Sequence, residues 1–134
     1  MQKTPRHNPK QVEFIEQRRK TDCGIACLAM LCHCLYADMA SAFYSKRKTT
    51  KGGIYPDDML EMLEDMGCEH NEVKKLPSKG CALVAIKWKE PNLTGHYVVW
   101  DGKRKQFLDP LHGVVDRDDF LALVDIDEIW KVTR

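Results

Sequence analysis

Cys23 is the residue of this sequence whose position most suggests nucleophilic chemistry. It follows Thr21 and Asp22, which are good helix N-cap residues, and it opens an apolar stretch that runs to Tyr36. A thiol in a first helical turn faces unpaired backbone N–H groups and the positive end of the helix dipole, which favour its thiolate form. Cys23 is therefore a candidate nucleophile, although a buried cysteine is more often an inert small hydrophobic residue.

A thiolate that cleaves a peptide bond needs a base, a group that orients the base, and donors for the oxyanion. His96 follows Gly95 at the expected start of a strand, so its ring can project from a sheet edge and serve as the base. Asp109 lies on the expected returning strand, where its carboxylate can accept from the imidazole and hold its tautomer. Gln17 carries an amide that can donate to an oxyanion. Each residue also has an ordinary structural interpretation, and it is their order along the chain that favours catalysis.

The six cysteines allow disulfides, metal binding or thiol chemistry. Because the N-terminal sequence has no apolar signal segment, we expect a cytoplasmic protein, in which disulfides are disfavoured. A Cys-x-x-Cys pair does not occur, so the sequence contains no zinc-ribbon motif. Cys23, Cys27 and Cys34 share one face of a continuous helix, where His33 or His112 could complete a soft-metal site. The apolar surroundings favour buried core thiols instead, and we expect neither a metal nor another cofactor.

Length and composition restrict the class of protein. A chain of 134 residues with 43% hydrophobic and 31% charged residues is typical of one globular domain. The 21 basic and 20 acidic residues nearly cancel, which argues against a strongly cationic nucleic-acid binder. The longest apolar run, Ile25 to Cys32, is far shorter than the roughly 20 residues of a membrane span. We therefore expect no nucleic-acid partner and no membrane span.

The charges are unevenly distributed along the chain. Residues 1–51 contain ten Lys and Arg against four Asp and Glu, whereas residues 52–134 contain eleven against sixteen. Two solvated faces of opposite sign would explain this asymmetry, and so would a basic rim that attracts an acidic partner. Residues 1–10, with two prolines and four basic residues when His7 is included, are expected to form an extended basic arm.

The pattern predicts helices first and strands afterwards. The apolar stretch Cys23–Tyr36 predicts a buried helix, Asp38–Tyr44 a shorter helix, and Ser45–Gly53 a basic loop. A further helix is expected to begin at Pro56 and to end at Gly67.

The second half of the sequence has the pattern of an antiparallel sheet. The predicted strands are Cys81–Ile86, Tyr97–Trp100, Gln106–Leu108 and Ile126–Val132, with a short helix at Phe120–Val124. Asp101-Gly102 suits a two-residue turn that joins the second and third of these strands. The order predicts the α+β class.

Three stretches carry the candidate residues and their neighbours: Gln17 with Cys23–Met30, Gly95–Val99, and Leu108–Pro110 with Gly113. Together they resemble the bacteriocin-processing peptidases, papain-like cysteine peptidases that cut leader peptides after a double glycine. Weaker similarities at Gly53, Leu60, Gly67 and Leu76–Ile86 extend the resemblance over about residues 11–127. The resemblance implies no role for four further features, which are Cys32, His33, Cys34 and the basic loop.

The resemblance implies a fold in which N-terminal helices and a central helix pack on a C-terminal antiparallel sheet. Residues 11–134 would form a single papain-like peptidase domain behind the arm. Cys23 would be the nucleophile, His96 the general base, Asp109 the group that orients His96, and Gln17 the oxyanion donor.

The implied substrate is a peptide or protein, with a flexible or Gly-rich segment at the cleavage site. In this family the peptidase domain usually lies in front of a membrane-spanning transporter domain. Because this sequence contains no membrane span, we expect a stand-alone peptidase. The alternative is a catalytically silent pseudo-peptidase domain that binds a peptide without cutting it.

Overall fold

A computed structural model describes residues 12–18, 21–46, 53–90 and 95–134. Three helices come first: α1 (Cys23–Leu31), α2 (Tyr36–Lys46) and α3 (Pro56–Asp65). Six strands follow: β1 (Glu69–Val73), β2 (Cys81–Trp88), β3 (His96–Asp101), β4 (Gln106–Asp109), β5 (Gly113–Asp116) and β6 (Val124–Thr133). A short helix, α4 (Arg117–Leu121), lies between β5 and β6. The α+β class is confirmed, and the expected arm at residues 1–10 lies outside the described residues.

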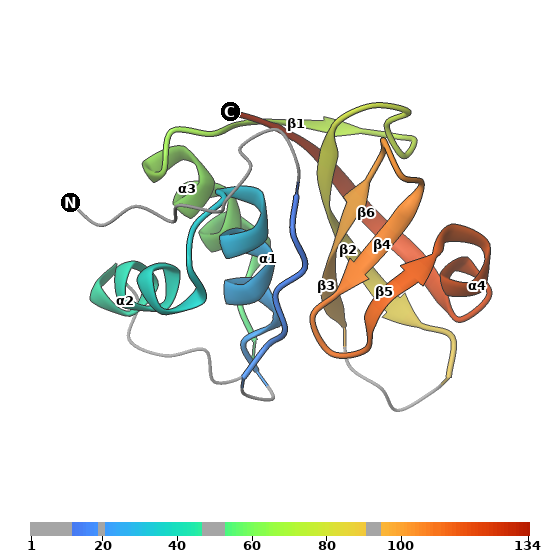
Figure 1. Ribbon diagram of the computed structural model, residues 1–134, viewed down its shortest axis with the longest axis horizontal. Coiled ribbons are helices and arrows are strands. Elements are labelled where there is room, and N and C mark those ends of the chain that lie inside the picture. The colour runs from blue at the N-terminus through green and yellow to red at the C-terminus, as the bar shows by residue number, and fades with distance from the viewer. Residues whose placement is uncertain (1–11, 19–20, 47–52, 91–94) are drawn as a thin grey trace.

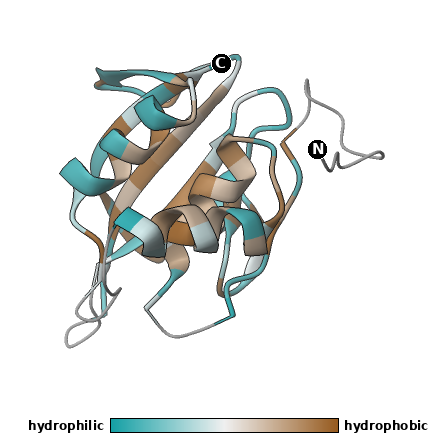
Figure 2. Ribbon diagram, turned by 90° about the vertical axis from the view of Figure 1, so that its left-hand side faces the viewer, coloured by the Kyte–Doolittle hydropathy of each residue, from teal (hydrophilic) through white to brown (hydrophobic). Residues whose placement is uncertain are grey.

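The strands form one sheet in the order β1-β6-β2-β3-β4-β5, and all neighbouring strands are antiparallel. Helices α1, α2 and α3 lie on one side of this sheet and α4 lies on the other (Figure 1). The side view shows hydrophobic strands behind helices that are partly hydrophilic on their outer turns (Figure 2). The sheet is therefore the shared wall of two hydrophobic cores.

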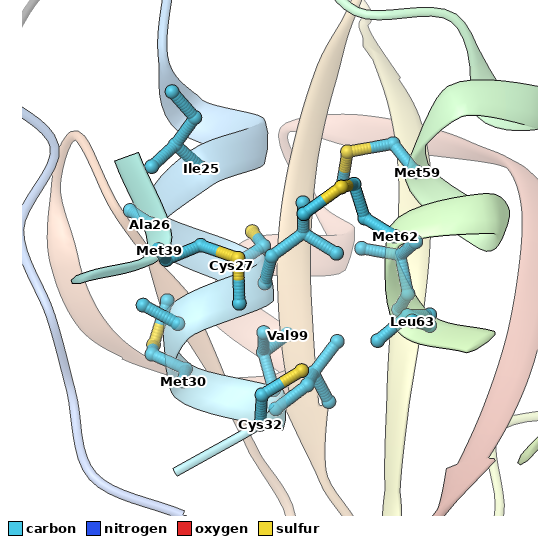
Figure 3. Packing of buried hydrophobic residues seen from close by; sticks show 14 of the residues in the cluster. Ile25, Ala26, Cys27, Met30, Cys32, Met39, Met59, Met62, Leu63 and Val99 are labelled. Carbon is cyan, nitrogen blue, oxygen red and sulfur yellow. The ribbon is translucent and has the colours of Figure 1, made fainter. Parts of the chain in front are cut away.

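The larger core joins the helices to the sheet. Every residue of α1 after Cys23 is buried, which explains why this helix is apolar all round. Figure 3 shows Cys27 and Met30 of α1 in the same cluster as Met62 and Leu63 of α3 and Val99 of β3. This packing holds the N-terminal end of α1 in a defined position beside the sheet.

The smaller core lies between the sheet and α4. Side chains alternate along β2 and β3, so that Leu83 and Val99 belong to the helical core while Val84 and Val98 face the α4 side. Both faces of these central strands are buried, which explains the continuous apolar run that predicted β2.

The boundaries of the first two predicted helices are wrong. The first helix ends at Leu31 rather than Tyr36, because His33 adopts a left-handed conformation with φ 56° and breaks the helix before α2 begins. The second helix continues to Lys46, so the predicted loop begins later than Ser45, and residues 47–52 lie outside the described residues. As a result Cys34 does not share a helix with Cys23 and Cys27.

The second half of the chain also departs from the predictions. Asp101 pairs with Gln106, so the hairpin has a four-residue loop and not a two-residue turn at Asp101-Gly102. The Asp101 carboxylate accepts from the backbone N–H groups of Lys103 (3.1 Å) and Arg104 (3.3 Å), which stabilises the longer loop. The polar edge strand β1 and the short strand β5 were not predicted. Helix α4 begins at Arg117, ahead of the expected Phe120, because the Asp116 side chain caps its N-terminus.

Among the described residues, no single helix is long and apolar enough to cross a membrane. Taken together, α1 with Cys32 and α2 have the required length and composition, but they are bent at 116° to each other.

Candidate active site

Cys23 begins α1 and lines a cleft of about 960 Å³ between the helices and the sheet. The helical wall contains Gln17 and residues 53–56, and the sheet wall contains His96. Asp22 occupies the N-cap position as expected, but its side chain makes no capping hydrogen bond. The Cys23 thiol is partly exposed, so a substrate in the cleft can reach it.

His96 connects Cys23 to a buried carboxylate. Its Nε2 donates to Asp109 Oδ1 at 2.7 Å, and its side chain also shares a hydrogen bond with Cys23. The His96 side chain is 8% exposed and that of Asp109 is fully buried. Because Nε2 is engaged by Asp109, Nδ1 is the nitrogen left for the thiol. The three residues form one chain of hydrogen bonds that ends in the cleft.

The Asp109 carboxylate accepts hydrogen bonds from two further groups besides His96. Its Oδ1 also accepts from the backbone N–H of Leu111 at 2.9 Å, and its Oδ2 accepts from Nδ1 of His112 at 2.8 Å. His112 was considered in the sequence only as a metal ligand, and its contact with Asp109 was missed. The available signal was the spacing Asp109-Pro110-Leu-His112, since a carboxylate at the start of a turn commonly binds groups two and three residues later.

These contacts shift the pKa values of both partners. Burial by itself would lower the pKa of His96, but its hydrogen bonds and its attraction to the charges of Asp109 and Cys23 raise it to about 9. Burial would raise the pKa of Asp109, but the hydrogen bonds and charge of His96, together with the donors His112 and Leu111, hold it below its usual value. The pair therefore exists as an imidazolium and a carboxylate near neutral pH.

Trp88, at the end of β2, packs against both histidines. Its ring is stacked on His96 with a centroid distance of 5.7 Å, and it meets His112 edge-on at 5.4 Å. It also contacts Phe120 of α4, so the smaller core supports the indole. Trp88 limits the rotation of His96 and excludes water from one side of the histidine pair, a role that the sequence did not reveal.

Gln17 lies beside the cleft on the segment that precedes α1. Its backbone N–H donates to the carbonyl of Pro110 at 2.9 Å, which anchors this segment to the turn after Asp109. The Tyr97 hydroxyl donates to the carbonyl of Ile54 at 2.7 Å, which ties the helical wall to the sheet. Of the four residues predicted for the site, Gln17, Cys23 and His96 line the cleft, and Asp109 lies directly behind His96.

Within the described parts of the chain, no group of three or more His, Cys, Asp or Glu side chains is arranged to hold a metal ion. Cys27 is fully buried in the core, and burial strongly raises the pKa of its thiol. The arrangement of Cys23, His96 and Asp109 is suited to acyl transfer by a thiolate.

Several solved structures have a fold similar to that of this chain. A double glycine motif protease from an AMS/PCAT transporter, solved in complex with the leader peptide, has a TM-score of 0.63 and 22% identity, covering 92% of this chain and 91% of that one. The peptidase domain of Streptococcus ComA, a bi-functional ABC transporter involved in quorum sensing, has a TM-score of 0.66 and 18% identity over 92% of this chain and 98% of that one. The same domain of Streptococcus mutans ComA has a TM-score of 0.61 and 17% identity over 90% and 98% of the two chains.

These similarities confirm the expected papain-like peptidase fold. No curated protein matches the sequence. The model of the peptidase C39 family matches residues 11–116, which include all four residues predicted for the site. The resemblance to the double-glycine leader peptidases is confirmed, and the chain belongs to the peptidase C39 family.

Proposed function

We propose that this protein is a cysteine peptidase that hydrolyses a peptide bond after small residues, in particular after Gly-Gly. The observation that carries the proposal is the hydrogen-bonded chain from Cys23 through His96 to Asp109 at the wall of a cleft. Membership of the peptidase C39 family supports the same reaction class.

The raised pKa of His96, to about 9, favours an imidazolium that stabilises the Cys23 thiolate. In the first step, the thiolate attacks the scissile carbonyl carbon and the carbonyl oxygen becomes an oxyanion. His96 then gives its proton to the leaving amine, and an acyl-enzyme remains on Cys23. The Asp109 carboxylate stabilises the imidazolium and fixes the ring orientation throughout this step.

The oxyanion would be held by the backbone N–H of Cys23 and the side-chain amide of Gln17. Gln17 lines the cleft together with Cys23, and its backbone is anchored to Pro110. Such donors act on charge that develops in the transition state and therefore lower the barrier rather than strengthen ground-state binding. Water, activated by neutral His96, would then hydrolyse the thioester.

The walls of the cleft suit a peptide with apolar side chains near the cleavage site. Tyr55, Leu111 and Leu123 line it with exposed fractions of 78%, 53% and 56%. Apolar groups exposed beside a reactive thiol favour the binding of an extended or helical peptide. The solved complex of a related protease with its leader peptide supports a peptide substrate.

Cleavage of matched peptides tests the proposal. Three synthetic peptides would share apolar flanking residues and differ at one central pair, which is Gly-Gly, Ala-Ala or Val-Val. We expect cleavage after the second glycine, slower cleavage of the Ala-Ala peptide and none of the Val-Val peptide, measured by liquid chromatography and mass spectrometry. Binding of all three without any cleavage would contradict the proposal and identify a pseudo-peptidase.

A further inference from the structure

Two thiols that have no part in the proposed peptidase reaction face each other in the helical core. Cys32 lies just beyond the last turn of α1 (Figure 3), and Cys68 lies between α3 and β1. Their Sγ atoms are 3.8 Å apart although the residues are 36 positions apart in sequence. A disulfide requires an S–S distance of about 2.05 Å, so the two sulfur atoms would have to approach by about a further 1.8 Å to be joined.

Cys68 borders a hollow in the surface at the start of β1. Cys68 lines it together with Glu64, Glu69 and His70. Because Cys68 is only 3% exposed, only a small molecule could reach it from this hollow. The hollow and the peptide cleft have no lining residue in common.

The electrostatic surroundings differ between the two thiols. The hydrogen bond with Cys32 lowers the pKa of Cys68, burial opposes this, and the charge of Arg134 adds to the lowering, with a resulting value of about 7. The same hydrogen bond and burial raise the pKa of Cys32, and the charge of Arg134 opposes this rise. Arg134 also donates to the backbone carbonyl of Cys32, which holds the guanidinium next to the pair. Cys68 is therefore the thiol of the pair that ionises more readily.

We propose that Cys68 and Cys32 form a dithiol site that reacts with hydroperoxides, with Cys68 as the attacking thiol and Cys32 as the resolving thiol. The proposal rests on the 3.8 Å contact, the opening beside Cys68 and the position of Arg134. It does not depend on the peptidase activity. Reversible disulfides of this kind are compatible with a reducing compartment, where they serve as redox-responsive sites.

The reaction has two balanced steps. The Cys68 thiolate attacks one oxygen of the hydroperoxide, an S–O bond forms, the O–O bond breaks, and the departing alkoxide or hydroxide takes up a proton. Cys68 is thereby oxidised by two electrons to a sulfenic acid, and the hydroperoxide is reduced to an alcohol or water. The Cys32 sulfur then attacks the Cys68 sulfur, the S–S bond forms, and hydroxide leaves and combines with the Cys32 proton as water.

The disulfide would link the end of α1 to the start of β1 and enclose α2 and α3 in a covalent loop. Cross-links across a loop of this length stabilise a folded protein mainly by restricting its unfolded chain. Cys23 lies at the opposite end of α1, roughly 13 Å away at 1.5 Å per residue. We therefore expect oxidation to raise the melting temperature by about 5 °C or more. The disulfide would not contact Cys23.

Peroxide treatment followed by thiol mapping tests the proposal. The reduced protein, as wild type and as Cys23→Ala, is treated with one equivalent of hydrogen peroxide, and residual thiols are blocked before proteolysis. We expect a Cys32–Cys68 disulfide in both proteins, reversal by a dithiol reductant, and the rise in melting temperature. The Cys23→Ala protein removes competition by the proposed nucleophile, so a failure of the peptidase assignment would leave this result unchanged.

Substitutions at the pair assign the order of the steps. Cys32→Ser should leave a sulfenic acid on Cys68 that a dimedone probe captures, whereas Cys68→Ser should abolish both the sulfenic acid and the disulfide. Cys81→Ser is the matched control, since burial raises the pKa of that half-buried thiol to about 11. The proposal is overturned if peroxide leaves Cys32 and Cys68 reduced in the Cys23→Ala protein, or if Cys32 carries the sulfenic acid instead.

Discussion

His96 Nε2 lies 2.7 Å from Asp109 Oδ1, and this contact joins the first residue of β3 to the last residue of β4. The two strands pair from Val99 and Leu108 to Asp101 and Gln106. His96 lies beyond the paired part of the hairpin, where its ring is able to turn toward both Asp109 and Cys23. Strand pairing thus brings the carboxylate to the imidazole, and the packing of α1 brings the thiol to the other side of the ring.

The two members of the His96–Asp109 pair should differ in their importance for turnover. His96→Ala should lower the rate of peptide cleavage by about 10²–10⁴-fold, because the proton donor is lost, and it should also slow the alkylation of Cys23. Asp109→Asn removes one charge-assisted hydrogen bond and should cost roughly 10- to 100-fold, because the thiolate–imidazolium pair retains part of its own alignment. Steady-state cleavage and timed alkylation measure both effects. His70→Ala, which alters a histidine paired with Glu64 away from the cleft, is the control. Wild-type rates in both variants would contradict the assignment.

His112 should act as a positioning residue for Asp109. His112→Ala removes the 2.8 Å contact with Oδ2 and should lower kcat by about 2- to 10-fold, the effect of one hydrogen bond. KM and the melting temperature should change little, because the His112 side chain is 55% exposed. Leu111→Ala is the matched control, since it alters the cleft surface but keeps the backbone N–H that binds Asp109. An increase in KM at constant kcat would show that His112 binds substrate instead.

Gln17 should affect cleavage and thiol reactivity unequally. Gln17→Ala should lower kcat by about a hundredfold, the usual effect of losing one oxyanion donor, while Cys23 is alkylated nearly as fast as in the wild type. The reason is that alkylation by iodoacetamide develops no oxyanion. Glu16→Ala, at an exposed neighbouring position, should change neither rate. Equal losses of the cleavage rate and the alkylation rate would mean that Gln17 stabilises the start of α1 and does not stabilise the transition state.

The pKa of His96 predicts how stability depends on pH. Its value of about 9 in the folded protein exceeds the usual 6.5, so the folded state binds this proton more tightly than the unfolded state does. The resulting stabilisation is fully present below pH 6.5 and is lost as the pH rises through about 9. We expect the free energy of unfolding of the wild type, relative to His96→Gln, to fall by roughly 3 kcal/mol between pH 6 and pH 10. Urea denaturation at a series of pH values measures this difference, and a difference that stays constant or grows with pH would be inconsistent with the ion pair.

The sequence predicted the positions of the site residues better than the elements around them. Cys23 does begin a buried helix and His96 does begin a strand, because an N-cap signal and a β-branched apolar run are local properties. The strands β1 and β5 were missed because they are edge strands with mostly polar or exposed residues. Their pairing depends on neighbours that are distant in sequence, which local patterns do not record.

Gly102 illustrates why the hairpin loop was predicted incorrectly. The residue was assigned to a two-residue turn. In the structure it lies where two loops approach so closely that a side chain would not fit. A Cβ at this position would lie 2.7 Å from the carbonyl oxygens of both Pro77 and Gly80. The Gly102 N–H also donates to Gly80 at 2.8 Å, so the glycine permits a tertiary contact that no local signal predicts. His112 was missed for a related reason, since its role depends on where the Asp109 carboxylate points.

The most direct test of the central claim is to identify the acyl-enzyme. A Gly-Gly peptide is mixed with the protein and quenched in acid during the first turnover, and the thiols are then mapped by mass spectrometry. The account predicts a thioester between the N-terminal half of the peptide and Cys23, its disappearance as cleavage is completed, and neither adduct nor cleavage in Cys23→Ala. An acyl group on any other residue, or undiminished cleavage by Cys23→Ala, would contradict it.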